Sequence, residues 1–303
     1  MIYTMTLNPS VDYIMELENF QKGGLNRTLN ESAFPGGKGI NVSRVLYRLE
    51  VSSVALGFAG GFTGNFIETF LKDEGINTDF VNIEEMSRIN VKVKADDETE
   101  INANGPEIKE GHLVALLDKI RKLTSEDILI LAGSIPKTVP KNFYGIIAEQ
   151  CEKQGTKIVI DAEKSLLESV LPFKPFLIKP NHHELGEIFD TEIKTEEDAI
   201  YYGELLKKKG VQNVIVSMAE KGALLFTGDN VFYSDVPKGE LKSSVGAGDS
   251  TVAGFIAGMV NGLNRKEAFR LGTAAGSATA FSIGLCTKEK IDSLLNKITI
   301  TEK

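Results

Sequence analysis

The 303-residue chain contains little cysteine and no long apolar run, and each scarcity narrows its possible roles. Cys151 and Cys286 have no CxxC spacing and offer no disulfide framework, which suits a reducing compartment, so we interpret both as structural thiols. No segment reaches the ~18 apolar residues of a membrane span. The apolar segment from Met1 to Leu7 lacks the basic region and the length of a secretory signal. We therefore expect a cytoplasmic protein without a membrane partner.

A basic cluster is also missing. The net charge is −8, and the 34 Lys and Arg residues are scattered along the chain, so nucleic-acid binding is not expected. Small anionic substrates stay possible, because a few locally placed cations can bind them whatever the net charge. The hydrophobic share of 42% and the length favour one large domain, residues 1–303, with a sizeable core.

Short apolar runs alternate with helical patterns along most of the chain. This alternation predicts an α/β fold, with a doubly wound, mainly parallel sheet covered on both faces. The expected strands are 2–7, 54–58, 128–132, 157–161, 176–179 and 214–217, and the expected helices are 40–49, 64–74, 112–123, 142–154 and 196–209.

Two segments, about 11–34 and 88–104, break this rhythm with alternating polar and apolar residues. Such alternation is typical of exposed, two-sided strands, and we assign both segments to a small β lid inserted into the domain. Half-polar strands that project from a core need a partner for their second face. A homodimer formed through the lids is therefore expected.

The strongest chemical signal is the segment Gly246-Ala247-Gly248-Asp249, which opens an apolar helix. Glycines let a backbone approach a ligand, and the N–H groups of a first helical turn favour an anion. Asp249 could be a simple N-cap, or a base that accepts the proton of an attacking hydroxyl group. The residues alone do not separate these two roles.

A second glycine-rich turn, Gly36-Gly37-Lys38-Gly39-Ile40-Asn41, also leads into a helix. It is not a P-loop, because Gly39 follows Lys38 where Ser or Thr would be needed. The segment could be a plain tight turn. Alternatively, close-approaching glycines, the Asn41 amide and the Lys38 cation suit the hydroxyl and phosphate groups of a sugar.

A third element, from Lys179 to Glu184, follows an expected strand at the sheet edge where open α/β sheets bind ligands. His182 and His183 are adjacent and point in different directions on a helix, which argues against a zinc site. Asn181 and Glu184 are three residues apart, so their oxygen atoms could meet on one face and act on Mg²⁺ directly or through water.

These segments, together with Ser217-Met218-Ala219-Glu220-Lys221-Gly222, occur in the order found in the PfkB (ribokinase-like) carbohydrate kinases, and the chain resembles that family over essentially its whole length. Within it, the similarity is greatest to bacterial 1-phosphofructokinases. The opening segment Thr6 to Asp12, the lid segment Arg88 to Lys92 and the segment Ala132 to Pro136 carry that finer resemblance.

The resemblance implies transfer of the ATP γ-phosphoryl group to fructose 1-phosphate, with Mg²⁺. Asp249 would be the base, and the backbone of Gly246, Ala247 and Gly248 the anion hole. The other implied contacts are Asp12, Gly37, Lys38 and Asn41 for the sugar, Arg27 and Arg88 for its phosphate, Lys179, Asn181, Ser217, Ala219, Glu220, Gly222 and Gly248 for the nucleotide, and Glu184 for Mg²⁺. Tagatose 6-phosphate kinase and a non-catalytic sugar or nucleotide sensor are the alternatives.

Overall fold

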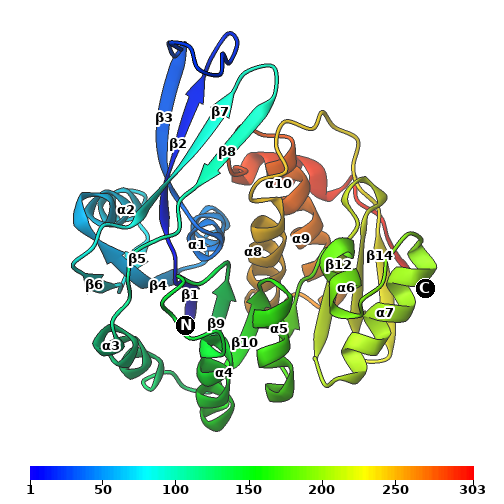
Figure 1. Ribbon diagram of the computed structural model, residues 1–303. Helices are drawn as coiled ribbons and strands as arrows, with labels where there is room; N and C mark the ends of the chain where they lie inside the picture. Colours follow the sequence, from blue (N-terminus) through cyan, green and yellow to red (C-terminus); the bar gives the residue numbers. More distant parts are fainter.

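The computed structural model describes residues 1–303 and arranges them around one large twisted sheet, from which a smaller sheet projects (Figure 1). The strands of the large sheet are β1 (Ile2–Thr6), β4 (Ser53–Gly60), β5 (Asn77–Thr78), β6 (Val81–Ile83), β9 (Ile128–Ala132), β10 (Lys157–Asp161), β11 (Leu177–Ile178), β12 (Asn213–Ser217), β13 (Ala223–Thr227), β14 (Asn230–Ser234) and β15 (Ile300–Glu302). Their order is β15-β14-β13-β12-β11-β10-β9-β1-β4-β5, with β6 paired to β4.

The middle of this sheet is parallel because its strands are apolar on both faces. All five residues of β9 are buried, and their side chains alternate between two hydrophobic clusters. Leu129 and Leu131 belong to one cluster, whereas Ile128 and Ile130 belong to the other. Such continuous apolar runs are stable only where helices cover both faces of a sheet.

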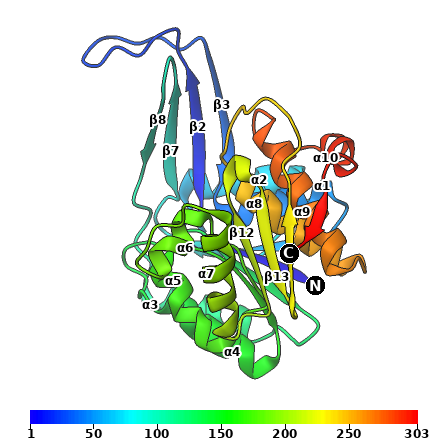
Figure 2. The ribbon, with the colours of Figure 1, turned by 90° about the vertical axis from the view of Figure 1, so that its right-hand side faces the viewer.

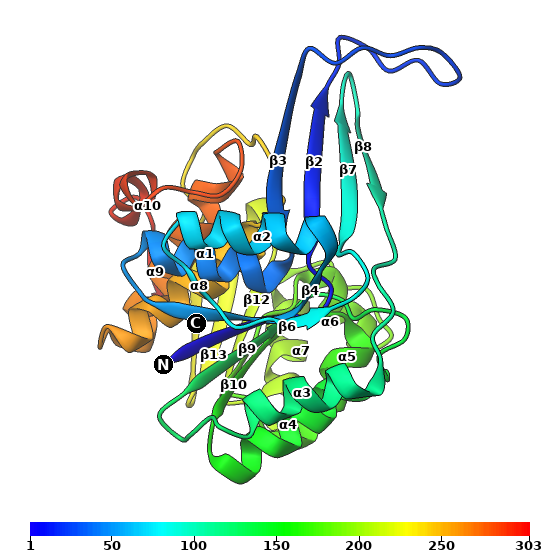
Figure 3. The same ribbon diagram turned by 90° about the vertical axis from the view of Figure 1, so that its left-hand side faces the viewer.

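Ten helices provide this cover. They are α1 (Lys38–Arg48), α2 (Gly61–Asp73), α3 (Glu110–Ile120), α4 (Phe143–Gln154), α5 (Lys164–Val170), α6 (His182–Ile188), α7 (Glu196–Lys208), α8 (Ala247–Val260), α9 (Arg265–Ala280) and α10 (Lys288–Leu295). Helices α3 to α7 contribute to one cluster and α1, α8, α9 and α10 to the other. Figure 3 shows α1 and α2 on the side of the sheet opposite to α3 and α4. The predicted doubly wound α/β fold is confirmed.

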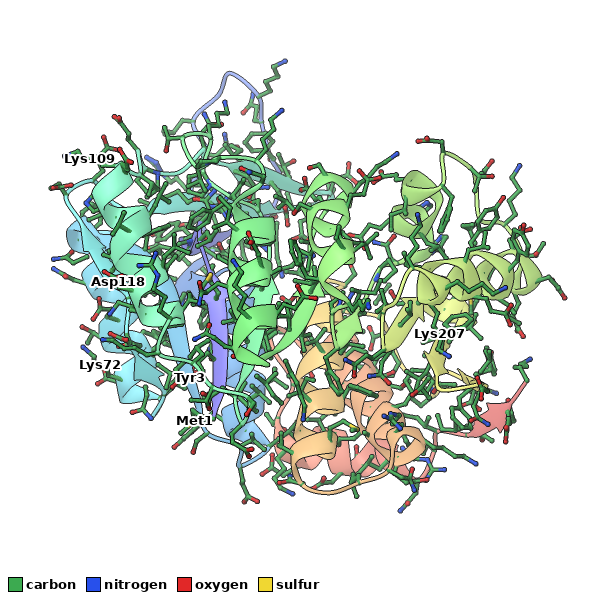
Figure 4. The ribbon with its side chains drawn as sticks, turned by 90° about the horizontal axis from the view of Figure 1, so that it is seen from below. Met1, Tyr3, Lys72, Lys109, Asp118 and Lys207 are labelled. Atoms are coloured by element: carbon green, nitrogen blue, oxygen red, sulfur yellow. The ribbon has the colours of Figure 1, made fainter.

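The outer faces of the helices are polar. Figure 4, seen from below, shows Lys72 of α2, Asp118 of α3 and Lys207 of α7 pointing away from the central sheet. Met1 and Tyr3 mark the first strand, β1, in the same view. None of the helices combines the length and apolar character that crossing a lipid bilayer requires.

The smaller sheet has four strands in the order β3-β2-β7-β8, and it stands away from the body of the molecule (Figures 2 and 3). Its strands are β2 (Ser10–Glu16), β3 (Asn30–Gly36), β7 (Arg88–Lys94) and β8 (Glu98–Asn102). Because successive side chains alternate between faces, Asp12 pairs with Asn90 on one face, while Tyr13, Val91 and Ile101 form a row on the other. One face is therefore polar and the other largely apolar.

The expected strands and helices are all present, with small shifts at their ends, but both ends of the large sheet were not predicted. At one end the short strands β5 and β6 pair with β4. After β12 the chain makes the antiparallel hairpin β13–β14, and β15 joins its outer edge. The segment from Ala223 to Thr227 is buried throughout and lacks the polar alternation that commonly marks a hairpin strand. Its antiparallel pairing follows from the tight turn at Gly228 and Asp229.

Two glycines at helical positions allow a test of this packing. A Cβ atom on Gly203 of α7 would collide with the ring of Phe226 on β13, whereas one on Gly111 of α3 would meet no atom within 4 Å. We expect Gly203→Ala to lower the free energy of unfolding by about 1–3 kcal/mol, because overpacking outweighs helix propensity. The matched control Gly111→Ala should raise it by about 0.5 kcal/mol. Urea denaturation measures both, and a stabilising Gly203→Ala would contradict the packing described.

Candidate active site

The candidate site lies at the carboxyl edge of the parallel strands. Asp161 is the last residue of β10, and Lys179 directly follows β11. Helix α1 begins here with Lys38, and helix α8 begins with Ala247. Open α/β sheets bind ligands at this edge because the loops that leave parallel strands converge there.

Helix α8 opens with an anion-binding geometry. Gly246 is the N-cap and has a φ of 79°, in the left-handed region that favours glycine. The first intrahelical hydrogen bond runs from the Ser250 amide to the Gly246 carbonyl, at 2.9 Å. N–H groups in a first helical turn have no intrahelical partner and, with the helix dipole, attract an anion. Asp249 is the third residue of the helix, so the interpretation of Asp249 as the N-cap is wrong.

Asp249 is a buried carboxylate with a defined partner. Its side chain is 5% exposed, and its Oδ2 accepts a 2.8 Å hydrogen bond from Nδ2 of Asn41 on α1. Burial raises the pKa of Asp249 to about 6, and the negative charge of Asp161 adds to the effect, while Lys38 opposes it. A carboxylate with a raised pKa that stays ionised at neutral pH has the properties of a general base.

Two lysines meet a second carboxylate beside Asp249. Asp161 is 2% exposed, and its Oδ1 lies 3.0 Å from Nζ of Lys38 and 3.6 Å from Nζ of Lys179. Burial alone would raise the pKa of Asp161, but the charges of Lys179 and Lys38 outweigh it and lower that pKa. The sequence interpretation named both lysines and missed Asp161. The acid that ends the apolar run Ile158 to Ile160 was the available signal.

Gly248 explains how these groups fit so closely. A Cβ atom at this position would lie 2.9 Å from Nζ of Lys179 and 3.9 Å from Oδ2 of Asp161. The absence of a side chain therefore leaves room for the lysine head group next to the first turn of α8. Gly37, with a φ of 119°, holds the backbone in a conformation that a side chain would strain immediately before Lys38.

Asp12 faces the site from the second sheet. Its Oδ1 accepts hydrogen bonds from Oγ of Ser10 at 2.7 Å and from Nδ2 of Asn90 at 3.1 Å, and Nζ of Lys92 lies 3.9 Å from its Oδ2. A Cβ atom on Gly36 would overlap the Asp12 carboxyl group, which places the Gly36–Gly37 turn against this side chain. Asn90 and Lys92 were missed as site residues, although they share a strand with Arg88.

The two arginines differ in position. Arg88 donates from Nε to the Asn8 carbonyl and from a terminal nitrogen to the Ala103 carbonyl, both at 3.1 Å, which fixes it at the base of the second sheet. Arg27 is exposed in the loop between β2 and β3, at the tip of that sheet (Figure 3), and makes no hydrogen bond or ion pair. The structure therefore does not bring Arg27 next to Asp249.

Asn181 and Glu184 are hydrogen-bonded to each other's backbone. The Asn181 side chain accepts from the Glu184 amide at 2.9 Å, and Oε2 of Glu184 accepts from the Asn181 amide at 2.8 Å, which makes a capping box for α6. Glu184 also lines a cavity of about 540 Å³ together with three other glutamates, Glu163, Glu168 and Glu187. Lys164 and Ser165 line the same cavity, and no three His, Cys, Asp or Glu side chains are grouped closely enough to hold a metal ion directly. A contact of Glu184 with Mg²⁺ would therefore run through water.

The loop after β12 lies beside Asn181. Asn181 forms an isolated parallel bridge with Ser217, and a short 3₁₀ turn follows at Ala219–Lys221. Gly222 ends the turn with a φ of 92°, and its carbonyl accepts from the Met218 amide at 2.8 Å. Ser217, Ala219, Glu220 and Gly222 thus form one compact, partly exposed loop next to Lys179 and Asn181.

Comparisons with known proteins agree with this geometry. Residues 5–291 match the pfkB family carbohydrate kinase. A 1-phosphofructokinase of Bacillus subtilis is 53% identical over 301 residues, which is 99% of each chain, and a D-tagatose-1-phosphate kinase of Bacillus licheniformis is 38% identical over 302 residues, also 99% of each. The crystal structure of phosphofructokinase-2 from Escherichia coli with fructose-6-phosphate has a TM-score of 0.92 and 28% identity, and the match covers 97% of this chain and 98% of that one.

The family match spans nearly the whole chain, and the two full-length relatives are both sugar-phosphate kinases by name. The buried Asp249 at the start of α8 and the neighbouring lysines are the kind of groups that phosphoryl transfer needs. The chain belongs to the pfkB family of carbohydrate kinases.

Proposed function

We propose that the chain transfers the γ-phosphoryl group of ATP to the 6-hydroxyl of fructose 1-phosphate, giving fructose 1,6-bisphosphate and ADP. The observation that carries the proposal is the hydrogen bond between Asn41 and Asp249. It supports the proposal because Asn41, on the first turn of α1 after the glycine-rich segment assigned to the sugar, contacts the residue proposed as the base. The 53% identity to a 1-phosphofructokinase over the full length supports the choice of acceptor.

In this reaction Asp249 accepts the proton of the 6-hydroxyl as its oxygen attacks the γ-phosphorus, and the bond from that phosphorus to the β-phosphate oxygen breaks. Negative charge spreads over the oxygens of the transferred group. The N–H groups of Gly246, Ala247 and Gly248 would stabilise this charge, the Ala247 amide by giving up its 3.3 Å hydrogen bond to the Ser244 carbonyl. These three residues are half-buried. Lys38 and Lys179 supply positive charge on either side.

The remaining contacts divide between the two substrates. Asp12, Gly37, Lys38 and Asn41 bind the sugar, and Arg88 binds its phosphate by exchanging a carbonyl partner for phosphate oxygens. Arg27 reaches that phosphate only if the β2–β3 loop folds over the site. Lys179, Asn181, Ser217, Ala219, Glu220 and Gly222 hold the nucleotide. Glu184 would hold Mg²⁺ through water, and the ion would supply positive charge against the ATP phosphates.

The second sheet acts as a lid in this proposal, built from about 11–34 and 88–104 on a single kinase domain. A kinase has to exclude water, because water competes with the sugar hydroxyl for the phosphoryl group. Asp12 and Arg88 on the polar face would be carried onto the sugar as the sheet moves.

The opposite face of the lid supports the homodimer. Tyr13 and Val91 are half-buried and Ile101 is 59% exposed, and the three form one cross-strand row. Apolar rows on a projecting sheet need a covering partner. A second lid, with its own apolar face, has the matching chemistry.

A specific observation favours one rival acceptor. One relative is named D-tagatose-1-phosphate kinase, and the substrate in that name has its phosphate at carbon 1, as fructose 1-phosphate does. Tagatose 1-phosphate is therefore a better-supported second candidate than the tagatose 6-phosphate suggested by the sequence. A non-catalytic sensor has no use for a base such as Asp249.

The acceptor is tested by coupled ADP release from Mg²⁺-ATP. Fructose 1-phosphate, tagatose 1-phosphate, tagatose 6-phosphate, fructose 6-phosphate and fructose are offered separately at equal concentration. We expect the largest kcat/KM with fructose 1-phosphate and the smallest with fructose, since fructose leaves the phosphate contacts empty. Preference for another sugar phosphate would keep the kinase and reject the acceptor, and absence of turnover with all five would reject the kinase.

Removal of the base is tested with Asp249→Asn. Turnover should fall by about 10²-fold or more, while Mg²⁺-ATP still binds. In the native enzyme, kcat/KM should fall as the pH drops below about 6, because Asp249 then takes up a proton and can no longer accept one. Substrate phosphates also titrate near pH 6. The residual activity of Asp249→Asn separates the two effects. Its pH profile should keep the decrease that comes from the substrate phosphates and should lack the decrease that comes from Asp249.

The same variant should be more stable than the native protein, so that lost activity cannot be assigned to unfolding. The folded state raises the pKa of Asp249, and the ionised carboxylate therefore destabilises the fold at neutral pH. Asp249→Asn should raise the free energy of unfolding at pH 7.5 by about 1–3 kcal/mol. The gain should disappear as the pH falls from 6 to 4. A variant that is less stable at pH 7.5 and inactive would leave Asp249 without its assigned role.

The dimer is tested with Ile101→Glu, which places a charge in the apolar row. Light scattering after size-exclusion chromatography should show a dimer for the native protein and a monomer for this variant. Asn102→Glu is the matched control, because it adds the same charge to the opposite face of the same strand. A native monomer, or a variant dimer as stable as the native one, would reject the interface.

A further inference from the structure

One buried carboxylate joins two lysines that come from different halves of the site. Oδ1 of Asp161 lies 3.0 Å from Nζ of Lys38 and 3.6 Å from Nζ of Lys179, and Oδ2 is buried without a hydrogen-bond partner. The polar contacts of the Asp161 carboxylate are therefore with the two ammonium groups alone. An ordinary structural ion pair would satisfy both oxygens.

The two lysines serve different ligands under the proposed function. Lys38 opens α1 directly after the turn assigned to the sugar. Lys179 lies two residues before Asn181 and beside the loop assigned to the nucleotide. The Asp161 carboxylate thus contacts one lysine from the sugar side of the site and one from the nucleotide side.

The position of Asp161 is fixed by its backbone. It pairs with Ala132 of β9, and its carbonyl accepts a 3.0 Å hydrogen bond from the Gly133 amide. Lys179 is held as well, because its side chain is 5% exposed and its Nζ fills the space that Gly248 leaves open. Lys38 is the freer of the two, with 38% of its side chain exposed.

Electrostatics decides what this arrangement does. Two ammonium groups in contact with one oxygen atom repel each other, and a low local dielectric strengthens that repulsion. Without the acid, the lysines would separate, or both would turn to whichever phosphate bound first. With the acid between them, a ligand that orders the freer Lys38 also steadies the carboxylate and Lys179, so the second ligand meets cations that are already in place.

We propose that Asp161 is a positioning residue that holds Lys38 and Lys179 in a fixed relation, so that a sugar phosphate bound on the Lys38 side strengthens binding of the ATP phosphates on the Lys179 side. The inference rests on the proposed function for the identity of the two ligands. Asp161 itself touches neither ligand and transfers no proton.

The proposal predicts an unusual division between kcat and KM for Asp161→Asn. The variant removes a negative charge from a site that binds two anions, so neither substrate alone should bind more weakly. The two phosphates should nevertheless be poorly aligned, and misplacement by about 1 Å costs about 10² in rate. We expect kcat to fall by about 10²-fold, while each KM, measured with the other substrate saturating, rises by no more than the lost synergy of about 5-fold.

Isothermal titration gives the direct test. A non-hydrolysable ATP analogue with Mg²⁺ is titrated into the full-length protein with and without saturating fructose 1-phosphate. The native protein should bind the analogue about 5-fold or more tightly when the sugar phosphate is present. In Asp161→Asn this ratio should fall to about 1. A native ratio of 1, or a variant that keeps the native ratio, would overturn the proposal.

Glu74→Gln is the matched control. It breaks a partly buried ion pair between Glu74, at the end of α2, and Arg44, on the same helix as Lys38, and should leave the binding ratio unchanged. Thermal unfolding shows whether Asp161→Asn is folded. If it is not, Asp161→Glu keeps the charge but shifts the carboxylate by one methylene, and it too should lose the ratio; a native ratio in Asp161→Glu would overturn the proposal.

Two further outcomes distinguish this proposal from a role of Asp161 in metal binding and from the proposed reaction itself. If Asp161→Asn keeps the native ratio and only raises the Mg²⁺ concentration needed for half-maximal rate, Asp161 acts on the metal and the proposal is wrong. Binding synergy needs no turnover. Failure of the native enzyme to phosphorylate fructose 1-phosphate would therefore reject the proposed reaction without deciding the role of Asp161.

Discussion

The candidate site depends on a balance of buried charges at one edge of the sheet. Asp161 and Asp249 are both almost inaccessible to water, and two ionised carboxylates cannot share such a place without cations. Lys38 and Lys179 provide them, and Asn41 adds a hydrogen bond. The lysines keep Asp161 ionised, whereas the compensation at Asp249 is incomplete and its pKa stays raised. The five side chains come from strand β10, the loop after β11 and the helices α1 and α8, so the fold has to be complete before the balance exists.

This balance also explains why the two acids behave differently. Asp161 contacts both ammonium groups and remains ionised, whereas Asp249 receives a neutral amide and feels the charge of Asp161. Under the proposed function, Asp249 would be the carboxylate that accepts a proton and Asp161 the one that stays charged. The same separation of two acids by their surroundings recurs wherever a site needs one charged and one proton-accepting carboxyl group.

Much of the fold could be predicted from local pattern. Buried strands such as 128–132 and 157–161 are unbroken apolar runs, and their limits agree with the structure. The hairpin β13–β14 was not predicted because Ala223 to Thr227 is as apolar as the parallel strands. The composition of a strand does not show whether it pairs in a parallel or an antiparallel direction. The glycine-rich turns were found because glycine marks a backbone constraint. Asp161, Asn90 and Lys92 were missed because an isolated polar residue gains its meaning only from partners that are distant in sequence.

The two sheets end in different ways. One edge of the large sheet is made by β5, with two residues, and β6, with three, and the other by β15, with three, so each edge strand is short. The small sheet ends in β3 and β8, with seven and five residues. Unpaired strand edges are where additional chains attach. The large sheet therefore offers little edge to which a further strand could pair. A strand from a second subunit or from a misfolded copy would pair more readily with the projecting sheet.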